Sequence, residues 1–332
     1  MYQRNILRLR GVAPRLQTHH HHLPHLPLTT QRAYSQFTPS NRLSNRTCMI
    51  TGGTSGIGFA IAERFLQEGA SRVILVGRSY ERLYNAASRL QIDSPAIPST
   101  EPSQLITNPE KHQLLESSPR ISLLIGDIAE AGSWTRELEK AMQATNPDIL
   151  INAAGLSISS ILPKSEPTDI SRILRTNLEG ALLTSRAFIR ASIRNRMKKS
   201  TLTTTATTTN GNPASSKCII NISSLLAHKS GTGAVPYAAS KAGVLGLTRS
   251  VAVEAAASLR DVVVRSNAIV PGYIETPMIS DFSDGETARL RESIPVRRFG
   301  KPEEVADAAV FLAQNEYANN CLLNLDGGLS AI

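Results

Sequence analysis

The sequence lacks long hydrophobic runs, has few cysteines and contains no acidic residue before Glu63. No run of about 18 apolar residues occurs, so the chain is not expected to span a membrane. Its three cysteines lie far apart and show no metal-ligand spacing with histidine, which argues against a disulfide framework or a bound metal. We interpret Cys48, Cys218 and Cys321 as small buried side chains in a reducing compartment.

Acidic residues are absent from residues 1–34, a segment that contains five arginines. Read as a helix, residues 2–13 carry Arg4 and Arg8 on one side and apolar residues toward the other, namely Tyr2, Ile6, Leu9 and Val12. An arginine-rich, acid-free, amphipathic start is typical of a mitochondrial presequence, so residues 1–34 predict import into the mitochondrial matrix. The alternatives are an unprocessed tail, or an expression tag suggested by the histidines at 19–22.

The net charge of +9 is unevenly spread along the chain. Removing the five arginines of residues 1–34 leaves 31 basic residues against 27 acidic ones, a net charge of +4. The basic balance is therefore partly a property of this first segment. It is weak evidence for a nucleic-acid partner, and none is predicted.

From Thr47 onward, short apolar β-branched runs alternate with helical patterns. This alternation predicts an α/β fold over residues 35–332: a single Rossmann-type domain whose doubly wound parallel sheet of about seven strands has helices on both faces. Strands that are apolar throughout are typical of a sheet covered on both sides. The expected strands are Thr47–Thr51, Arg72–Gly77, Ile121–Ile125, Asp148–Asn152, Lys217–Ser223, Val262–Ile269 and Cys321–Leu325.

Two stretches interrupt this alternation. Residues 91–119 contain five prolines, which prevent a continuous helix or a central strand. Residues 200–216 are rich in threonine and serine and have almost no apolar bulk. Both are predicted to be surface insertions between core elements.

A glycine-rich turn follows the first expected strand and opens a helix. Glycine allows the tight turn and the close approach of backbone to a pyrophosphate, and the helix N-terminus offers free N–H groups to the anion. The strand–turn–helix context favours a nucleotide site over a plain loop. The candidate cofactor-binding residues in this turn are Gly52, Thr54, Ser55, Gly56, Ile57 and Gly58.

The spacing Gly-x-x-x-Gly-x-Gly resembles that of the short-chain dehydrogenase/reductase family. At the end of the second strand, an acid would bond the ribose of NAD, whereas this chain has Arg78, which can pair with the 2′-phosphate of NADP; Ser79 and Thr54 add hydroxyl donors. NADP(H) is therefore the predicted cofactor. Asp127 matches the position that contacts adenine, with a helix N-cap as the alternative. The run Asn152, Ala153, Ala154 and Gly155 matches a motif that lies beside the cofactor.

Tyr237 and Lys241 are spaced to share one face of a helix. A nearby ammonium and the nicotinium ring of a bound cofactor favour the phenolate, and we expect them to lower the tyrosine pKa toward the operating pH, as a proton donor requires. The resemblance implies that both residues also contact the cofactor. It further implies catalytic roles for Ser224, which would bond the reacting carbonyl oxygen, and for Asn177, which would hold a water near the lysine. Ser223 is the adjacent alternative to Ser224.

The segment after the sixth strand resembles the part of the family that closes over the nicotinamide, with Pro271, Gly272, Ile274 and Thr276 as expected contacts. Residues 279–295 would then form a substrate lid. Residues 294–306, 237–247 and 326–328 resemble bacterial-type 3-oxoacyl-acyl-carrier-protein reductases. Together with the presequence, they predict an enzyme of mitochondrial fatty-acid synthesis.

Acyl carrier proteins are acidic, so a basic patch near the active-site entrance would steer them. The candidates are Arg194, Arg196, Lys198, Lys199 and Arg260, with a solvated helix end as the alternative. The resemblance implies a homo- or hetero-oligomer, a tetramer or dimer. However, the chain between Glu316 and Asp326 is about two residues shorter than the family pattern, in a segment that helps to form a subunit contact.

Two other functions stay open on sequence grounds. One is a short-chain reductase acting on a quinone, a steroid or another ketone, because fold and catalytic residues do not define a substrate. The other is a non-catalytic NADPH-binding sensor. A sensor would be expected to have lost the tyrosine or the lysine, and both are present.

Overall fold

One eight-stranded sheet organises the computed structural model, which describes residues 40–90, 111–202, 216–229, 231–258, 262–279 and 282–332, with side chains omitted at 198–202. The strands are β1 Thr47–Thr51, β2 Arg72–Gly77, β3 Leu114–Ser118, β4 Ile121–Ile125, β5 Ile149–Asn152, β6 Lys217–Ile222, β7 Val264–Pro271 and β8 Leu322–Leu325. Their order is β3-β4-β2-β1-β5-β6-β7-β8, and every pair is parallel except β3 with β4. The predicted doubly wound α/β fold is confirmed.

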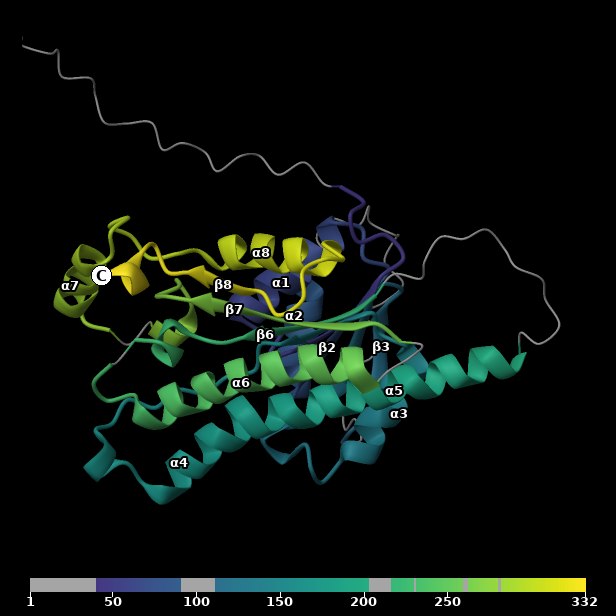
Figure 1. The fold of residues 1–332 in the computed structure, drawn as a ribbon. Helices are drawn as coiled ribbons and strands as arrows, with labels where there is room; N and C mark the ends of the chain where they lie inside the picture. Colours follow the sequence, from purple (N-terminus) through teal and green to yellow (C-terminus); the bar gives the residue numbers. More distant parts are fainter. Residues whose placement is uncertain (1–39, 91–110, 203–215, 230, 259–261, 280–281) are drawn as a thin grey trace, which may run out of the picture. The chain divides into compact units, whose positions relative to one another are not determined.

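Helices cover both faces of this sheet (Figure 1). On one face lie α1 Gly56–Gln67, α2 Tyr80–Leu90 and α8 Pro302–Gln314, packed on a core that includes Ile50 and Leu75. On the other lie α3 Thr135–Thr145, α5 Gly180–Leu202 and α6 Val235–Ser258, over a core that includes Met49 and Ile74. Neighbouring residues of β1 and β2 thus enter opposite cores, because successive side chains of a strand point to opposite faces.

Shorter helices sit near the carboxyl ends of the strands. These are α4 Pro167–Leu174, α7 Asp284–Ser293, and the short turns η1 Ile128–Glu130, η2 Leu162–Lys164, η3 Arg175–Glu179, η4 Leu225–Ala227, η5 Pro277–Ile279 and η6 Leu329–Ala331. None of the described helices is both long enough and apolar enough to cross a bilayer.

Strand β3 corrects the prediction of an insertion over the whole of residues 91–119. Residues 114–118 pair antiparallel with β4 at the edge of the sheet. The strand has only five residues, and Glu116 is exposed. A short polar strand at the edge of a sheet has no run of buried apolar residues, so the sequence pattern does not reveal it. Three predicted segments lie outside the described residues: residues 91–110 of the first insertion, most of the second insertion at 200–216, and the predicted presequence at 1–34.

The burial that the sequence predicts for the three cysteines is found at two of them. Cys48 and Cys218 are fully buried, Cys321 is partly buried, and all three are free thiols. Burial raises the pKa of the Cys48 and Cys218 thiols. Within the described residues, no group of three His, Cys, Asp or Glu side chains is arranged to hold a metal ion.

Candidate active site

The glycine-rich turn lies between the carboxyl end of β1 and the first residue of α1. Gly52 has a φ of +70°, and a Cβ there would lie 2.7 Å from the Cα of Ala154. A Cβ on Gly58 would lie 2.4 Å from the carbonyl oxygen of Gly52. These approaches are possible only where positions 52 and 58 have no Cβ, which explains the need for glycine at both.

The start of α1 is open to an anion. Ser55 is the N-cap residue, and its side chain makes no capping hydrogen bond among the described residues. The N–H groups of the first helical turn thus keep the capacity to bind an anion, and the helix dipole favours one. Ile57 is partly buried in this turn, and Thr54 lies beside Gly77 at the end of β2.

Other predicted segments converge on the same turn. The segment Asn152–Ala154 lies against the glycine turn, because the backbone of Ala154 occupies the space that a Cβ on Gly52 would need. A Cβ on Gly56 would lie 3.2 Å from Cγ2 of Thr276, so the segment after β7 reaches the turn from another direction. Within that segment, Pro271 ends β7, Gly272 packs on Asp326, and Ile274 bridges to Gly300.

Arg78 lies one residue beyond β2, with its side chain 60% exposed. Its Nη1 is 4.0 Å from Oδ2 of Asp127, a long pairing that leaves the guanidinium free to turn toward a phosphate. Asp127 accepts a hydrogen bond from the N–H of Ala129 at 2.9 Å, so it acts as the N-cap of η1. Ser79 accepts one from the N–H of Arg82 at the start of α2. Both capping roles still leave these side chains partly exposed at the edge of the cleft.

The residues around this turn fit a phosphorylated dinucleotide. A pyrophosphate requires close approach to the backbone and an open helix N-terminus, and the glycine turn and the start of α1 provide both. A ribose phosphate requires a nearby positive charge, and the exposed Arg78 at the end of β2 provides it.

Tyr237 and Lys241 lie one turn apart on α6, as predicted, with Nζ of Lys241 5.6 Å from the centre of the Tyr237 ring. The ammonium is buried and donates a hydrogen bond to the carbonyl oxygen of Ile222 at 2.9 Å. Ser224 follows β6, and a hydrogen bond joins its side chain to that of Tyr237. Ser223 instead points into α6 and donates to the carbonyl oxygen of Lys241. The geometry thus places Ser224, and not its neighbour, beside the phenol.

The titration of this pair differs from the sequence-based expectation. Burial raises the pKa of Tyr237, and the hydrogen bond from Ser224 opposes that rise without reversing it. Burial also lowers the pKa of Lys241 from 10.5 to about 8. In the chain without its cofactor, the pKa of Tyr237 is thus raised and not lowered, because desolvation of the phenolate outweighs the hydrogen bond from Ser224. The phenol is held in its protonated, proton-donating form.

Asn177 lies in η3, a single π-helical turn between α4 and α5. Its Oδ1 accepts from the N–H of Leu156 at 2.7 Å, and its Nδ2 donates to the carbonyl oxygen of Leu156 and to Oγ of Ser240, both at 2.9 Å. A Cβ on Gly155 would lie 3.5 Å from Nζ of Lys241 and 3.8 Å from Oδ1 of Asn177. The bare backbone of Gly155 therefore leaves space between these two groups.

A buried polar network that sequence reasoning missed holds the two long helices to the sheet. Asn152 donates to Ser185 and to Asn221, and Thr184 donates to Asn152. Ser240 links Asn177 to the carbonyl oxygen of Tyr237 at 2.6 Å. The partners lie far apart in the chain, so no local pattern reports them. Satisfied buried networks of this kind favour a single arrangement of the catalytic helix.

The predicted lid, residues 279–295, lies partly outside the described residues, at 280–281. Its described part packs beside the catalytic loop: Ile294 forms a small core with Leu225, Phe299 and Leu329. Leu225 directly follows Ser224, so the predicted lid and the predicted catalytic serine belong to one packing unit.

Comparisons with known proteins agree with this geometry. A family model described as short chain dehydrogenase matches residues 46–101, and one described as enoyl-(acyl carrier protein) reductase matches residues 107–330. The 3-oxoacyl-[acyl-carrier-protein] reductase of Thermotoga maritima is 31% identical, over 87% of this chain and 99% of its own length. The chain belongs to the short-chain dehydrogenase family.

Further members of the short-chain dehydrogenase family are similar in sequence and in structure. The 3-oxoacyl-[acyl-carrier-protein] reductase of Bos taurus is 29% identical, over 86% of this chain and 98% of its own. A solved structure from Beutenbergia cavernae, described as an NAD(P)-dependent gluconate 5-dehydrogenase with NADP bound at low occupancy, superposes with a TM-score of 0.69. It is 26% identical and covers 89% of this chain and 100% of its own. The fold is thus one that binds NAD(P).

Arg194, one residue of the basic patch predicted near the entrance, lies away from the catalytic end of the sheet. Asn195, next to Arg194, donates to Asn146, which caps the end of α3 just before β5. Ser224 follows the opposite, carboxyl end of the neighbouring parallel strand β6. Arg194 is therefore at the far edge of the sheet, because α5 runs away from the catalytic end. The side chains of Lys198, Lys199 and Arg260 lie outside the described residues, and Arg196 is exposed on α5.

Proposed function

We propose that the protein reduces 3-oxoacyl thioesters carried on acyl carrier protein, with NADPH as the reductant, in the mitochondrial matrix. The observation that carries the reductase proposal is the convergence of Tyr237, Lys241 and Ser224 near the glycine turn, whose Thr54 lies beside Gly77 and thus next to Arg78. The substrate is supported by the curated relatives named for that activity in bacteria and mammals. The location is supported by residues 1–34, which are rich in arginine and contain no acidic residue. When these residues are fused to a fluorescent protein, they should direct it to mitochondria.

The bound nicotinamide would supply the hydride to the substrate carbonyl carbon. Tyr237 donates its phenolic proton to the carbonyl oxygen, and the raised pKa of Tyr237 keeps that proton available at neutral pH. Ser224 bonds the same oxygen as its negative charge develops. The buried ammonium of Lys241 stabilises the phenolate that forms when the proton has left.

The residues that would hold the cofactor follow from the geometry of the turn. The backbone of residues 52–58 and the start of α1 would hold the pyrophosphate, and Arg78 with Thr54 and Ser79 the ribose phosphate. Asp127 would face the adenine, while Ala153, Ala154 and Gly155 would line the cleft floor. Ile274 and Thr276 would face the carboxamide.

A panel of substrates tests the reaction class and the substrate together. Purified protein lacking residues 1–34 should reduce 3-oxoacyl thioesters faster than diketones, quinones or gluconate-type ketones. A trans-2-enoyl thioester belongs in the panel because of the name of the matching family model. Turnover of another ketone, without turnover of any thioester, would favour the alternative of a general carbonyl reductase, a name that one relative from Danio rerio carries.

Arg78 tests the choice of cofactor. Substitution of Arg78 by alanine should weaken NADPH binding by about ten- to a hundredfold, since a charged hydrogen bond to phosphate contributes about 1.5–3 kcal/mol. Binding of NADH should change by less than about threefold, because NADH has no 2′-phosphate for the guanidinium to contact. Fluorescence titration of both dinucleotides measures the effect. Equal weakening of the two would contradict the phosphate contact.

A further inference from the structure

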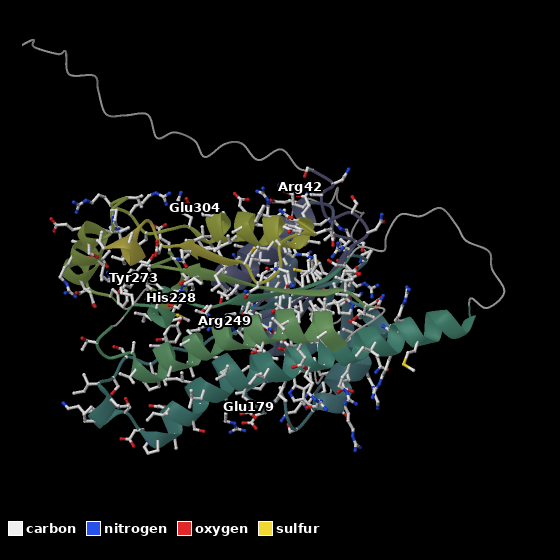
Figure 2. The ribbon with its side chains drawn as sticks, in the orientation of Figure 1. Arg42, Glu179, His228, Arg249, Tyr273 and Glu304 are labelled. Atoms are coloured by element: carbon white, nitrogen blue, oxygen red, sulfur yellow. The ribbon has the colours of Figure 1, made fainter. Side chains whose placement is uncertain are left out.

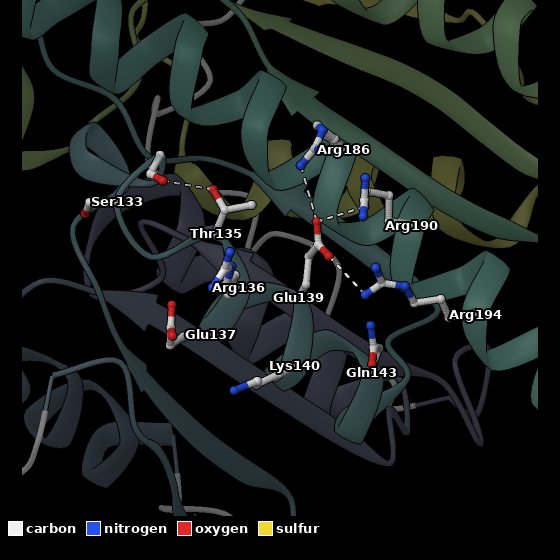
Figure 3. A pocket seen from close by; sticks show the side chains of 11 residues that line it. Ser133, Thr135, Arg136, Glu137, Glu139, Lys140, Gln143, Arg186, Arg190 and Arg194 are labelled. Carbon is white, nitrogen blue, oxygen red and sulfur yellow. Dashed lines mark hydrogen bonds and ion pairs between the residues drawn. The ribbon is translucent and has the colours of Figure 1, made fainter.

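A charged groove lies between α3 and α5, outside the catalytic cleft (Figure 3). It is a depression of about 900 Å³. Five of its lining residues are basic and two are acidic, so the groove has a net charge of +3 at neutral pH. The lining residues are Gly132, Ser133, Thr135, Arg136, Glu137, Glu139, Lys140, Gln143, Arg186, Arg190 and Arg194.

Three arginines of α5 surround one carboxylate. Glu139 on α3 is buried, with Nη1 of Arg186 at 3.3 Å, Nε of Arg190 at 3.0 Å and Nη1 of Arg194 at 3.1 Å from its oxygens. Each arginine side chain is between 43% and 51% exposed, so its remaining N–H groups can face the groove. The carboxylate thus orients the guanidinium groups that a second anion would meet.

The charge of this cluster is incompletely neutralised. The three arginines repeat every four residues along α5, a spacing at which like charges repel. The Glu139 carboxylate offsets one of the three arginines. On α3, Arg136 and Lys140 add two exposed positive charges and Glu137 offsets one of these, so a net charge of +3 remains. A bound anion with more than one negative group would relieve this repulsion and accept several charge-assisted hydrogen bonds.

The chemistry of the lining selects the kind of ligand. No aliphatic or aromatic side chain is among the lining residues. A protein partner or a membrane would find no apolar centre to bury here, whereas protein interfaces depend on one. A soluble polyanion needs none, and arginine forks match phosphate oxygens. We propose that this groove is a second ligand site, which binds a small molecule bearing at least two phosphate groups.

The groove is connected to the catalytic end through α5. Arg186 directly follows Thr184 and Ser185, whose side chains bond Asn152 beside the glycine turn. A ligand that holds α3 against α5 would therefore steady the helix that supports the cofactor cleft. Because coupling between two sites is reciprocal, NADPH and the second ligand should change each other's affinity by the same factor.

Calorimetric titration with tripolyphosphate tests this site. The full-length protein, saturated with NADPH so that the cofactor cleft is filled, should bind one tripolyphosphate per chain in about 0.15 M salt. The double variant Arg136→Gln/Lys140→Gln removes two exposed charges that make no ion pair with any of the described residues, so folding should be unaffected. It should bind about tenfold more weakly or worse, and Arg190→Gln should weaken binding similarly.

The matched control is Arg249→Gln, which removes an exposed arginine of α6 that does not line the groove (Arg249 is labelled in Figure 2). It should leave tripolyphosphate binding unchanged. Equal affinity in all the variants, or no saturable binding, would overturn the proposal. Binding of an oligoglutamate peptide with the same arginine dependence, without binding of tripolyphosphate, would overturn it in favour of a protein-docking surface. If NADPH does not bind, the proposed reductase function is contradicted, but the second site is still tested. In that case tripolyphosphate binding to the wild-type protein and to the groove variants is compared in the absence of NADPH.

Discussion

Replacement of Tyr237 by phenylalanine is expected to lower kcat/KM for carbonyl reduction by about a thousandfold or more, within the range of general acid catalysis. The change removes the phenolic oxygen and leaves the aromatic ring on the same face of α6 as Lys241. Proton delivery to the carbonyl oxygen is lost, while Ser224 and the cofactor cradle remain. Binding of NADPH should therefore change by less than about threefold.

Steady-state assays with the best substrate of the panel, together with NADPH titration, separate the two effects of this substitution. Tyr317→Phe is the matched control, because Tyr317 is 98% exposed and lies outside the site, and it should retain full activity. Unchanged turnover in Tyr237→Phe would refute the proton-donor role. Loss of NADPH binding in that variant would mean that the phenol has a role in binding instead.

Replacement of Lys241 by methionine should abolish most of the activity and at the same time remove the cost of a buried charge at neutral pH. The buried amine has its pKa lowered from 10.5 to about 8, because burial penalises the charged form. Methionine fills a similar volume without a charge. The hydrogen bond to the carbonyl oxygen of Ile222 is lost at every pH, so it offsets a constant part of this gain and leaves the pH dependence unchanged. The two pKa values differ by about 2.5 units, which corresponds to a cost of about 3 kcal/mol for holding the ammonium in the folded chain at pH 7.

The sign of the pH dependence follows from proton binding. Between pH 8 and 10.5, the lysine of the unfolded chain holds a proton that the folded chain has released, so the stability of the wild-type protein rises with pH through this window. The advantage of the methionine variant is thus complete below pH 8 and shrinks above it. From pH 7 to pH 9.5, the difference in unfolding free energy between variant and wild type should fall by about 2 kcal/mol.

Urea unfolding of both proteins at the two pH values measures this difference, and every other titrating group is common to the pair. A difference that stays constant with pH would contradict the lowered pKa of Lys241. Activity provides the second readout, since the proposed stabilisation of the phenolate requires the ammonium, and reduction by the wild-type protein should decline as pH rises above about 8.

Local patterns were sufficient for much of the fold. The runs that became β1, β2 and β4 were predicted with their observed limits, because buried parallel strands are apolar along their whole length. Strand β7 runs from Val264 to Pro271, so it begins and ends two residues later than the predicted strand Val262–Ile269. The polar edge strand β3 was missed because its stability comes from pairing with β4.

Most of the candidate site residues could be predicted from motifs in the sequence. Each motif indicates one property of the site. The glycines at 52, 56 and 58 allow a particular backbone conformation, Arg78 provides positive charge, and the Tyr237–Lys241 pair can transfer a proton. These are properties of individual residues and their spacing, so they can be recognised without coordinates. The choice of Ser224 over Ser223 required the structure, because only the direction of each hydroxyl distinguishes them.

The sequence by itself determined the doubly wound fold, the glycine cradle and the residues available for proton transfer, since these depend on local periodicity, backbone freedom and residue type. Tertiary structure alone decided the protonation of the site and the location of the arginines. Burial from several elements reverses the expected direction of the Tyr237 pKa, and the path of α5 carries Arg194 to the far edge of the sheet, where it meets Glu139. Desolvation and long-range contacts are sums over groups distant in the chain, so no local pattern contains them.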